Sequence, residues 1–136
     1  MAHPFDTEVV AADHKVYSGQ AISLVAPAVD GYLGILAGHA PLIASLTVGE
    51  LRITPPDATP VEIAISGGFI RVEHDRVTIL ADTAELATEI DIERAQHAKE
   101  RAEERLKAHV PEVDFERAQA ALLRAINRLR VVRRGL

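Results

Sequence analysis

Residues 1–87 alternate short apolar runs with turn residues, a pattern that is typical of β-strands. In the clearest case, Val61, Ile63 and Ile65 alternate with Glu62 and Ala64, so one face of that run should be buried. The expected strands are 5–11, 15–17, 21–26, 32–36, 43–46, 51–53, 61–65, 69–72 and 76–80. Many short strands at this spacing predict a β-sandwich or barrel rather than alternating strands and helices.

Two breaks in this pattern carry specific expectations. Pro27 is expected to end the strand 21–26. Gly67 and Gly68 are expected to form a bend or a bulge between the runs 61–65 and 69–72. A phosphate-binding loop at these glycines is disfavoured, because the spacing and the lysine of a P-loop are missing.

From residue 88 onwards the pattern becomes helical, and one motif appears twice. The sequence IDIERA at 90–95 returns 23 residues later as VDFERA at 113–118. Aspartate is a good helix N-cap, and the apolar residue before it can pack on the fourth helical residue as a hydrophobic staple. The repeat therefore predicts two helices, which begin just after Asp91 and Asp114 and are stapled by Ile90 with Ala95 and by Val113 with Ala118.

The apolar positions of the second helix predict how the two helices pack. They are Phe115, Ala118, Leu122, Ala125, Leu129 and Val132, and their alternating spacings of three and four form a coiled-coil seam. The first helix offers Ala95, Ala98, Ala102 and Leu106. The connection around Pro111 is short, so we expect an antiparallel hairpin. Alanine buries little apolar area, so this hairpin should be marginally stable and able to open.

Composition and charge divide the chain at the same place. The 136 residues fit a domain at 1–87 followed by a helical appendage at 88–136. Four basic and eleven acidic side chains lie in residues 1–88, whereas eleven basic and nine acidic ones lie in residues 89–136. Such a split indicates two parts with different partners. Neither a signal peptide nor a membrane-spanning helix is expected.

Several kinds of chemistry are disfavoured by the residues available. The chain has no cysteine, which excludes disulfides and cysteine-based sites. Its six histidines lack metal-ligand spacing, and its serines lack the pattern of a nucleophile with a base. With no tryptophan and few aromatic residues, a base-stacking surface is also disfavoured. We therefore expect no catalytic residues, no metal site and no required cofactor.

The arginines of the second helix are its most informative charges. Arg117, Arg124 and Arg128 lie on one helical face, and the last two have no acid three or four positions away. A helix-one carboxylate, a phosphate or an acidic protein surface could pair with them, and a solvated basic face is the alternative. The motif at 90–95 could bind a nucleotide through the helix N-terminus and Arg94, or could simply start a helix.

With these pieces placed, the chain resembles the epsilon subunits of bacterial F-type ATP synthases. The resemblance covers nearly the whole chain and is most specific at 34–42, 66–69, 77–84 and the two terminal helices. It implies a flattened β-sandwich of about ten strands followed by a helical hairpin. It also implies a non-catalytic subunit of the central stalk, which couples the gamma subunit to the c ring in proton-driven ATP synthesis. Such a subunit is peripheral at the cytoplasmic face of the cell membrane and reaches the membrane only through the complex.

The resemblance further implies that the helices inhibit ATP hydrolysis and that ATP, as a regulatory ligand, holds the hairpin folded. By position, the ATP-binding residues would be Glu85, Ile90, Asp91, Arg94, Ala95, Arg101, Arg124 and Arg128. In the extended state, the helices would reach the catalytic alpha and beta subunits. The contacts to the beta subunits would come from Arg124, Arg128, Arg130, Arg133 and Arg134. Tyr32 and His39 would contact the rotor, with Tyr32 at a turn where many relatives carry an acid.

One alternative remains from the residues themselves. The hairpin could be a binding module whose basic tail recognises nucleic acid or an acidic protein. The acidic platform before it argues against nucleic acid.

Overall fold

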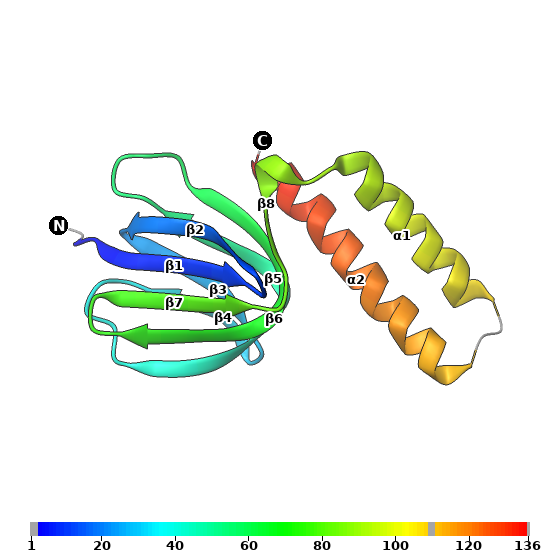
Figure 1. Cartoon of the computed structure of the whole chain (residues 1–136), viewed down its shortest axis with the longest axis horizontal. Coiled ribbons are helices and arrows are strands. Elements are labelled where there is room, and N and C mark those ends of the chain that lie inside the picture. The colour runs from blue at the N-terminus through cyan, green and yellow to red at the C-terminus, as the bar shows by residue number, and fades with distance from the viewer. Residues whose placement is uncertain (1–2, 109–110, 136) are drawn as a thin grey trace.

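The computed structural model describes residues 3–108 and 111–135 and places a β-sandwich beside a pair of helices (Figure 1). The strands are β1 Phe5–Ala11, β2 His14–Ala21, β3 Ser23–Ala28, β4 Gly31–Ile35, β5 Leu42–Thr54, β6 Val61–Glu73, β7 Arg76–Ala81 and β8 Ala84–Leu86. The helices are the short 3-10 helix η1 Ala87–Glu89, then α1 Ile92–Lys107 and α2 Glu112–Gly135. The expected fold class is confirmed.

The strands form one hydrogen-bonded sheet in the order β2-β1-β7-β6-β5-β3-β4, with β8 added to β6. The pairing of β1 with β7 is parallel, and the other pairings are antiparallel. The sheet curls so that its alternating apolar side chains enclose one core, to which every strand from β1 to β7 contributes. The core includes Leu24, Leu51, Ile63 and Ile79, each almost fully buried.

The described residues form eight strands rather than about ten. Of the nine runs expected from the sequence, two pairs merge into single strands, and β8 is a strand that no run predicted. The runs 43–46 and 51–53 belong to one strand, β5, and the runs 61–65 and 69–72 belong to β6. Gly67 and Gly68 adopt φ values of +85° and +118°, which turn the backbone inside β6. The β5–β6 ladder continues on both sides, with Leu46 opposite Gly68 and Val48 opposite Ser66. Glycine therefore bends this strand without ending it.

Pro27 also lies inside a strand, so the expectation that it ends β3 is wrong. It is opposite Tyr32 in the β3–β4 pair. On the other side of β3, the register with β5 shifts between Val25 and Ala28. Proline has no N–H group to give to a ladder, and an irregular stretch of this kind is where a strand accommodates it.

Helix α1 begins as the motif predicts. Asp91 is its N-cap, and the Asp91 Oδ1 atom accepts a hydrogen bond from the Arg94 N–H group at 3.1 Å. Ile90 and Ala95 belong to the same small buried cluster, which confirms the first staple.

The second copy of the motif does not start α2. The helix already begins at Glu112, and the Phe115 N–H group donates to the Pro111 carbonyl at 3.0 Å. Asp114 therefore lies within the first turn, where its charge still suits the positive end of the helix dipole. Proline needs no N–H partner at a helix start. The helix therefore begins directly after Pro111 rather than after Asp114. The expected staple of Val113 with Ala118 involves a side chain outside the described residues.

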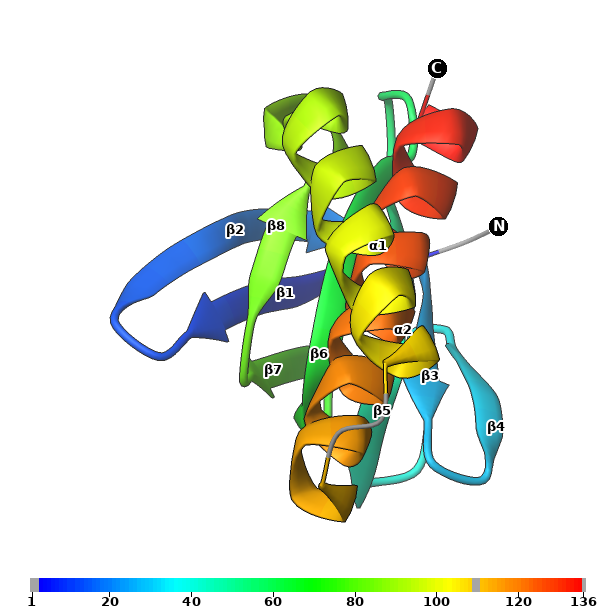
Figure 2. The same ribbon diagram turned by 90° about the vertical axis from the view of Figure 1, so that its right-hand side faces the viewer.

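Helix α2 lies between α1 and the sandwich (Figure 2). It packs on β5, β6 and η1 on one side and on α1 on the other. The expected seam with α1 is present, because the alanines at 95, 102, 118 and 125 and Val132 are buried. Phe115 is 41% exposed, and Ala98, Leu106, Leu122 and Leu129 are half-buried. A helix covered on two sides needs a second buried stripe, which the seam pattern alone did not predict.

Candidate functional site

The predicted ATP-binding residues gather around two adjoining pockets between the sandwich and the helices. The first, here called the helix pocket, has a volume of about 390 Å³ and is lined by Glu85, Glu89, Ile90, Asp91, Arg94, Ala95, Ala98, Arg101 and Arg128. The second, here called the sheet pocket, has a volume of about 310 Å³ and is lined by His14, Ala64, Ile65, Ser66, Thr83, Ala84, Glu85, Glu89, Arg124, Asn127 and Arg128. Seven of the eight predicted residues line the helix pocket, and Arg124 lines the sheet pocket.

Four elements bring these side chains together. The cap at Asp91 fixes the start of α1, and Arg94, Ala98 and Arg101 follow at spacings of four and three on one face. β8 contributes Glu85, which is held opposite Ala64 of β6. α2 contributes its arginines from the other side of the hairpin, and η1 contributes Glu89.

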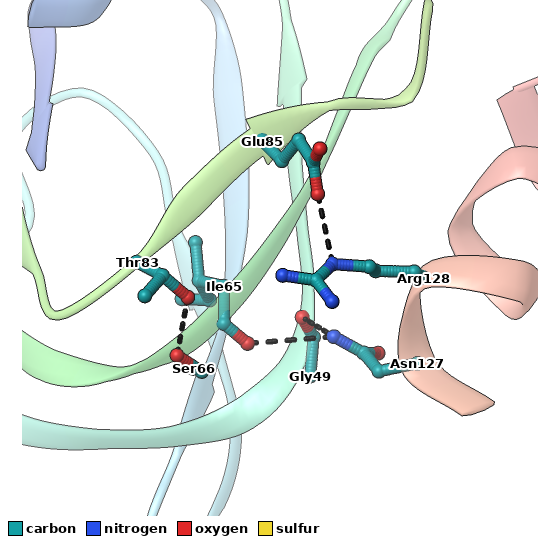
Figure 3. Close-up of polar contacts among 7 residues, drawn as sticks. All are labelled: Gly49, Ile65, Ser66, Thr83, Glu85, Asn127 and Arg128. Atoms are coloured by element: carbon teal, nitrogen blue, oxygen red, sulfur yellow. Dashed lines mark hydrogen bonds and ion pairs between the residues drawn. The ribbon is translucent and has the colours of Figure 1, made fainter. Parts of the chain in front are cut away.

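The Glu85–Arg128 ion pair is part of the lining of both pockets, and Figure 3 shows the pair. The Arg128 Nε atom donates to Glu85 Oε1 at 2.9 Å. This answers the question of the partner for Arg128: it is a carboxylate from β8. Both side chains are more than a third exposed, at 37% and 38%. A pair this open contributes about 1 kcal/mol at most, so a multiply charged anion can compete for the arginine.

Arg124 lies one helical turn before Arg128 and has no ion pair within the described part of the chain. Around it, the sheet pocket offers the Ser66 and Thr83 hydroxyl groups, which hydrogen-bond to each other, and the ring of His14, the first residue of β2. His14 Nδ1 is 2.7 Å from Asp13 Oδ1, and this hydrogen bond lowers the pKa of the exposed Asp13 carboxyl group.

The chemistry of the helix pocket suits a phosphorylated ligand that also carries hydrogen-bond donors. The N-terminal end of α1 and three guanidinium groups favour negative charge there. The carboxylates of Glu85, Glu89 and Asp91 can accept hydrogen bonds from amino or hydroxyl groups. The apolar surface of Ile90 and Ala95 completes the lining. A nucleotide has all three kinds of surface.

Sequence reasoning missed Asn127, a buried polar residue on the sheet-facing side of α2. Its Nδ2 group donates to the Gly49 carbonyl at 2.8 Å and to the Ile65 carbonyl at 3.4 Å (Figure 3). Because Asn127 lies between Arg124 and Arg128, the sequence pattern predicts that it belongs to a solvated face. The sequence offered one indication of a buried face here: Val131, an apolar residue four positions after Asn127, lies outside the seam pattern. Val131 is fully buried in the structure.

The other predicted contact residues lie outside these pockets. Tyr32 in β4 is 63% exposed, and His39 is partly exposed in the loop after β4. Arg130 and Arg133 are exposed on α2, while the Arg134 side chain lies outside the described residues. In the described ranges 3–108 and 111–135, there is no group of three potential metal ligands and no helix long and apolar enough to cross a membrane.

Comparison with known proteins assigns this arrangement to a family. Residues 4–87 match the model of the ATP synthase delta/epsilon chain beta-sandwich domain, and residues 88–133 match that of the ATP synthase delta/epsilon chain long alpha-helix domain. The chain is 50% identical over 99 residues to the ATP synthase epsilon chain of Halalkalibacterium halodurans, covering 73% of this chain and 74% of that one. It is 48% identical over 111 residues to the epsilon chain of Carboxydothermus hydrogenoformans, covering 82% of both.

Solved structures share the fold. One chain of the Euglena gracilis mitochondrial ATP synthase, solved as OSCP/F1/c-ring, superposes with a TM-score of 0.78 at 24% identity, covering 88% of this chain and 76% of that one. One chain of the Tetrahymena thermophila mitochondrial central stalk and c-ring gives 0.56 at 13% identity, covering 98% and 97%. A sandwich followed by a helical hairpin is thus the domain pair of a rotary ATP synthase subunit. The chain belongs to the epsilon subunits of bacterial F-type ATP synthases.

Proposed function

We propose that this epsilon subunit is a non-catalytic part of the central stalk that couples the gamma subunit to the c ring. Its helices restrain ATP hydrolysis by the alpha and beta subunits, and ATP holds the hairpin docked. It works as a peripheral subunit at the cytoplasmic face of the bacterial membrane. The helix pocket is the observation that carries the regulatory part. There β8, α1 with the two residues before it, and α2 together present seven of the eight predicted ATP-binding residues.

A ligand in the helix pocket touches both helices, so it binds only while they are together. Binding to one state alone stabilises that state by RT ln(1 + [L]/Kd), which is about 2.7 kcal/mol at a hundredfold excess over Kd. The α1–α2 seam consists largely of alanines, whose burial contributes little free energy per residue. ATP can therefore decide between a docked and an open hairpin.

The open state would use the same arginines for a second partner. Arg124 and Arg128 leave the pockets when α2 leaves the sheet, and they join Arg130, Arg133 and Arg134 in a basic stretch. Such a stretch is complementary to an acidic surface of the beta subunits. Tyr32 and His39 of the sandwich remain available to the rotor in both states, because they lie outside the pockets.

Calorimetry on the isolated full chain tests the ATP site. We expect millimolar ATP to give a saturable binding signal, and Arg94→Ala to weaken it by roughly ten- to a hundredfold, because a hydrogen bond from a charged group contributes about 1.5–3 kcal/mol. Arg117→Ala is the matched control, since Arg117 has the same place in the second motif copy and is exposed. No binding signal from the unaltered chain, or an equal loss of ATP affinity in both variants, would mean that the motif only starts a helix.

The same isolated chain tests the non-catalytic assignment. Steady release of phosphate from ATP by the pure protein would contradict that assignment.

A truncation after Ala87 tests the division of roles. The main core comes from residues 5–81, so the shortened chain is expected to stay folded, bind gamma and support coupled ATP synthesis. ATP hydrolysis by the reassembled complex should rise several-fold, because the inhibitory helices are gone. Gamma binding is measured by co-purification and hydrolysis by a coupled assay. Loss of gamma binding by a folded fragment would show that the helices, and not the sandwich, make that contact.

A further inference from the structure

The face of α2 that meets the sheet contains a buried polar group in addition to its apolar contacts. Asn127 is 5% exposed, and Val131, one turn further on, is fully buried against the same surface. The Asn127 Nδ2 group donates to two carbonyls at once, 2.8 Å from Gly49 O and 3.4 Å from Ile65 O. The apolar contact would tolerate sliding of the helix, whereas a hydrogen bond of this length does not.

Both acceptors belong to the same rung of the sheet. Gly49 of β5 and Ile65 of β6 are register partners, at the middle of the two longest strands. A shift of α2 by one turn would carry the amide about 5.4 Å away from them. A single buried polar group that is satisfied in only one register is a known device for specifying one arrangement among several apolar ones.

We propose that Asn127 is the latch that fixes α2 on the sheet in one register and so assembles the ATP pockets. Arg124 and Arg128 lie three positions before and one position after it, and they line the pockets only in that register. Asn127 acts through these arginines and is a positioning residue. The docking role stands on the geometry alone, while its effect on hydrolysis rests on the proposed function.

Replacing the amide by a carboxylate reverses the interaction without changing its shape. In Asn127→Asp, an oxygen takes the place of the donor and faces two carbonyl oxygens in a buried position. Asn127→Leu instead removes the donor and keeps an apolar side chain of similar size. Gln119→Glu makes the same amide-to-acid change at an exposed position of α2 and controls for charge alone.

The experiment measures the distance between the sheet and α2 in the full chain. Cysteines at Asp57 and Ala120, both exposed, give two unique label sites because the chain has none of its own. The unaltered chain and Gln119→Glu should show one distance. Asn127→Asp should reduce the ratio of docked to undocked chains at least tenfold at neutral pH. Asn127→Leu should broaden the distance distribution and weaken ATP binding at least tenfold.

The pH profile separates a latch from general disruption. Docking places the introduced carboxyl group among carbonyl oxygens, which raises its pKa above the undocked value. The docked state of Asn127→Asp should therefore be present below the undocked pKa and lost as pH rises through the docked pKa. The charged and titratable groups that line the sheet pocket with Asn127 are His14 of β2, Glu85 of β8, Glu89 of η1, and Arg124 and Arg128 of α2. Glu50 of β5 is buried next to Gly49 and opposite Ala64. They are present in Asn127→Leu as well, so the difference between the two profiles reports the introduced group.

Three results would overturn the latch. They are an unchanged distance in Asn127→Asp at neutral pH, a single distance with full ATP affinity in Asn127→Leu, and an equal loss of docking in Gln119→Glu. The proposed function fails separately. If Asn127→Asp undocks α2 in the isolated chain but the assembled enzyme hydrolyses ATP at the unaltered rate, the latch stands and the inhibitory role is wrong.

Discussion

Gly68→Ala is expected to destabilise the sandwich by about 4 kcal/mol or more, among the largest effects of any single substitution. A Cβ atom at this position would lie 2.1 Å from the Leu80 carbonyl oxygen and 2.8 Å from the Ala81 Cα atom. Both are backbone atoms, and Gly68 and Ala81 are ladder partners, so the close approach cannot be relieved by rotating a side chain. The φ of +118° is also one that residues with a Cβ rarely adopt.

Two other glycines divide this effect into its parts. Gly38 has a φ of +79° but open space around its Cβ position, so Gly38→Ala should cost only about 1–2 kcal/mol of backbone strain. Gly34 has open space and no positive φ, so Gly34→Ala should change stability by about 0.5 kcal/mol or less. Urea unfolding of the three variants measures the loss in free energy of unfolding for each. A cost for Gly68→Ala close to that of Gly38→Ala would mean that the β6–β7 pair yields to the added methyl group.

The double variant Arg124→Ala with Arg128→Ala is expected to lose ATP binding about a hundredfold or more and to inhibit hydrolysis less. Two hydrogen bonds from charged groups at about 1.5 kcal/mol each already give that factor. Arg128 is paired with Glu85 in the docked state, and Arg124 lines the adjoining sheet pocket. Phosphate oxygens can engage both when docked, and an acidic beta-subunit surface can engage both when open. In the proposed function, one pair of side chains therefore serves both states.

The control for this double variant removes two charges elsewhere. Arg105→Ala with Arg117→Ala changes exposed arginines that line neither pocket, one on each helix. Calorimetry with ATP and hydrolysis by the reassembled complex are measured for both pairs, and only the first pair should change. Weaker ATP binding with full inhibition would show that the open state uses other side chains, such as Arg130 and Arg133.

The fold was predictable wherever the decisive interactions are local. The cap of α1 depends on Asp91 and the N–H group three residues later, so the motif alone places that boundary. The same motif failed at Asp114, because Pro111 offers a competing start three residues earlier. The bend or bulge expected at Gly67 and Gly68 is present, but the sequence does not show that partners in β5 and β7 continue past it and join the two runs into one strand. Long-range pairing decided the strand count.

The site divides in the same way. The residues around the helix pocket carry recognisable side chains in a recognisable order, and seven of the eight residues that the resemblance named line this pocket. Asn127 was not predicted as a site residue, because its hydrogen-bond partners are main-chain carbonyls 78 and 62 positions away in the sequence. A carbonyl has no sequence signature, so no pattern of residue types could have paired the asparagine with its rung.

The placement of α2 between α1 and the sheet imposes an order of events on the hairpin. The outer interface is an alanine seam, and the inner one adds the Asn127 hydrogen bonds and the Glu85–Arg128 ion pair. α1 can swing away while α2 stays seated, but α2 cannot leave without either carrying α1 along or breaking both interfaces. The proposed opening would therefore pass through an intermediate, in which α1 has left α2 while Arg124 and Arg128 still lie beside the sheet. If the helices restrain ATP hydrolysis as proposed, the assembled enzyme should therefore have three levels of hydrolysis rather than two, one for each arrangement of α1 and α2.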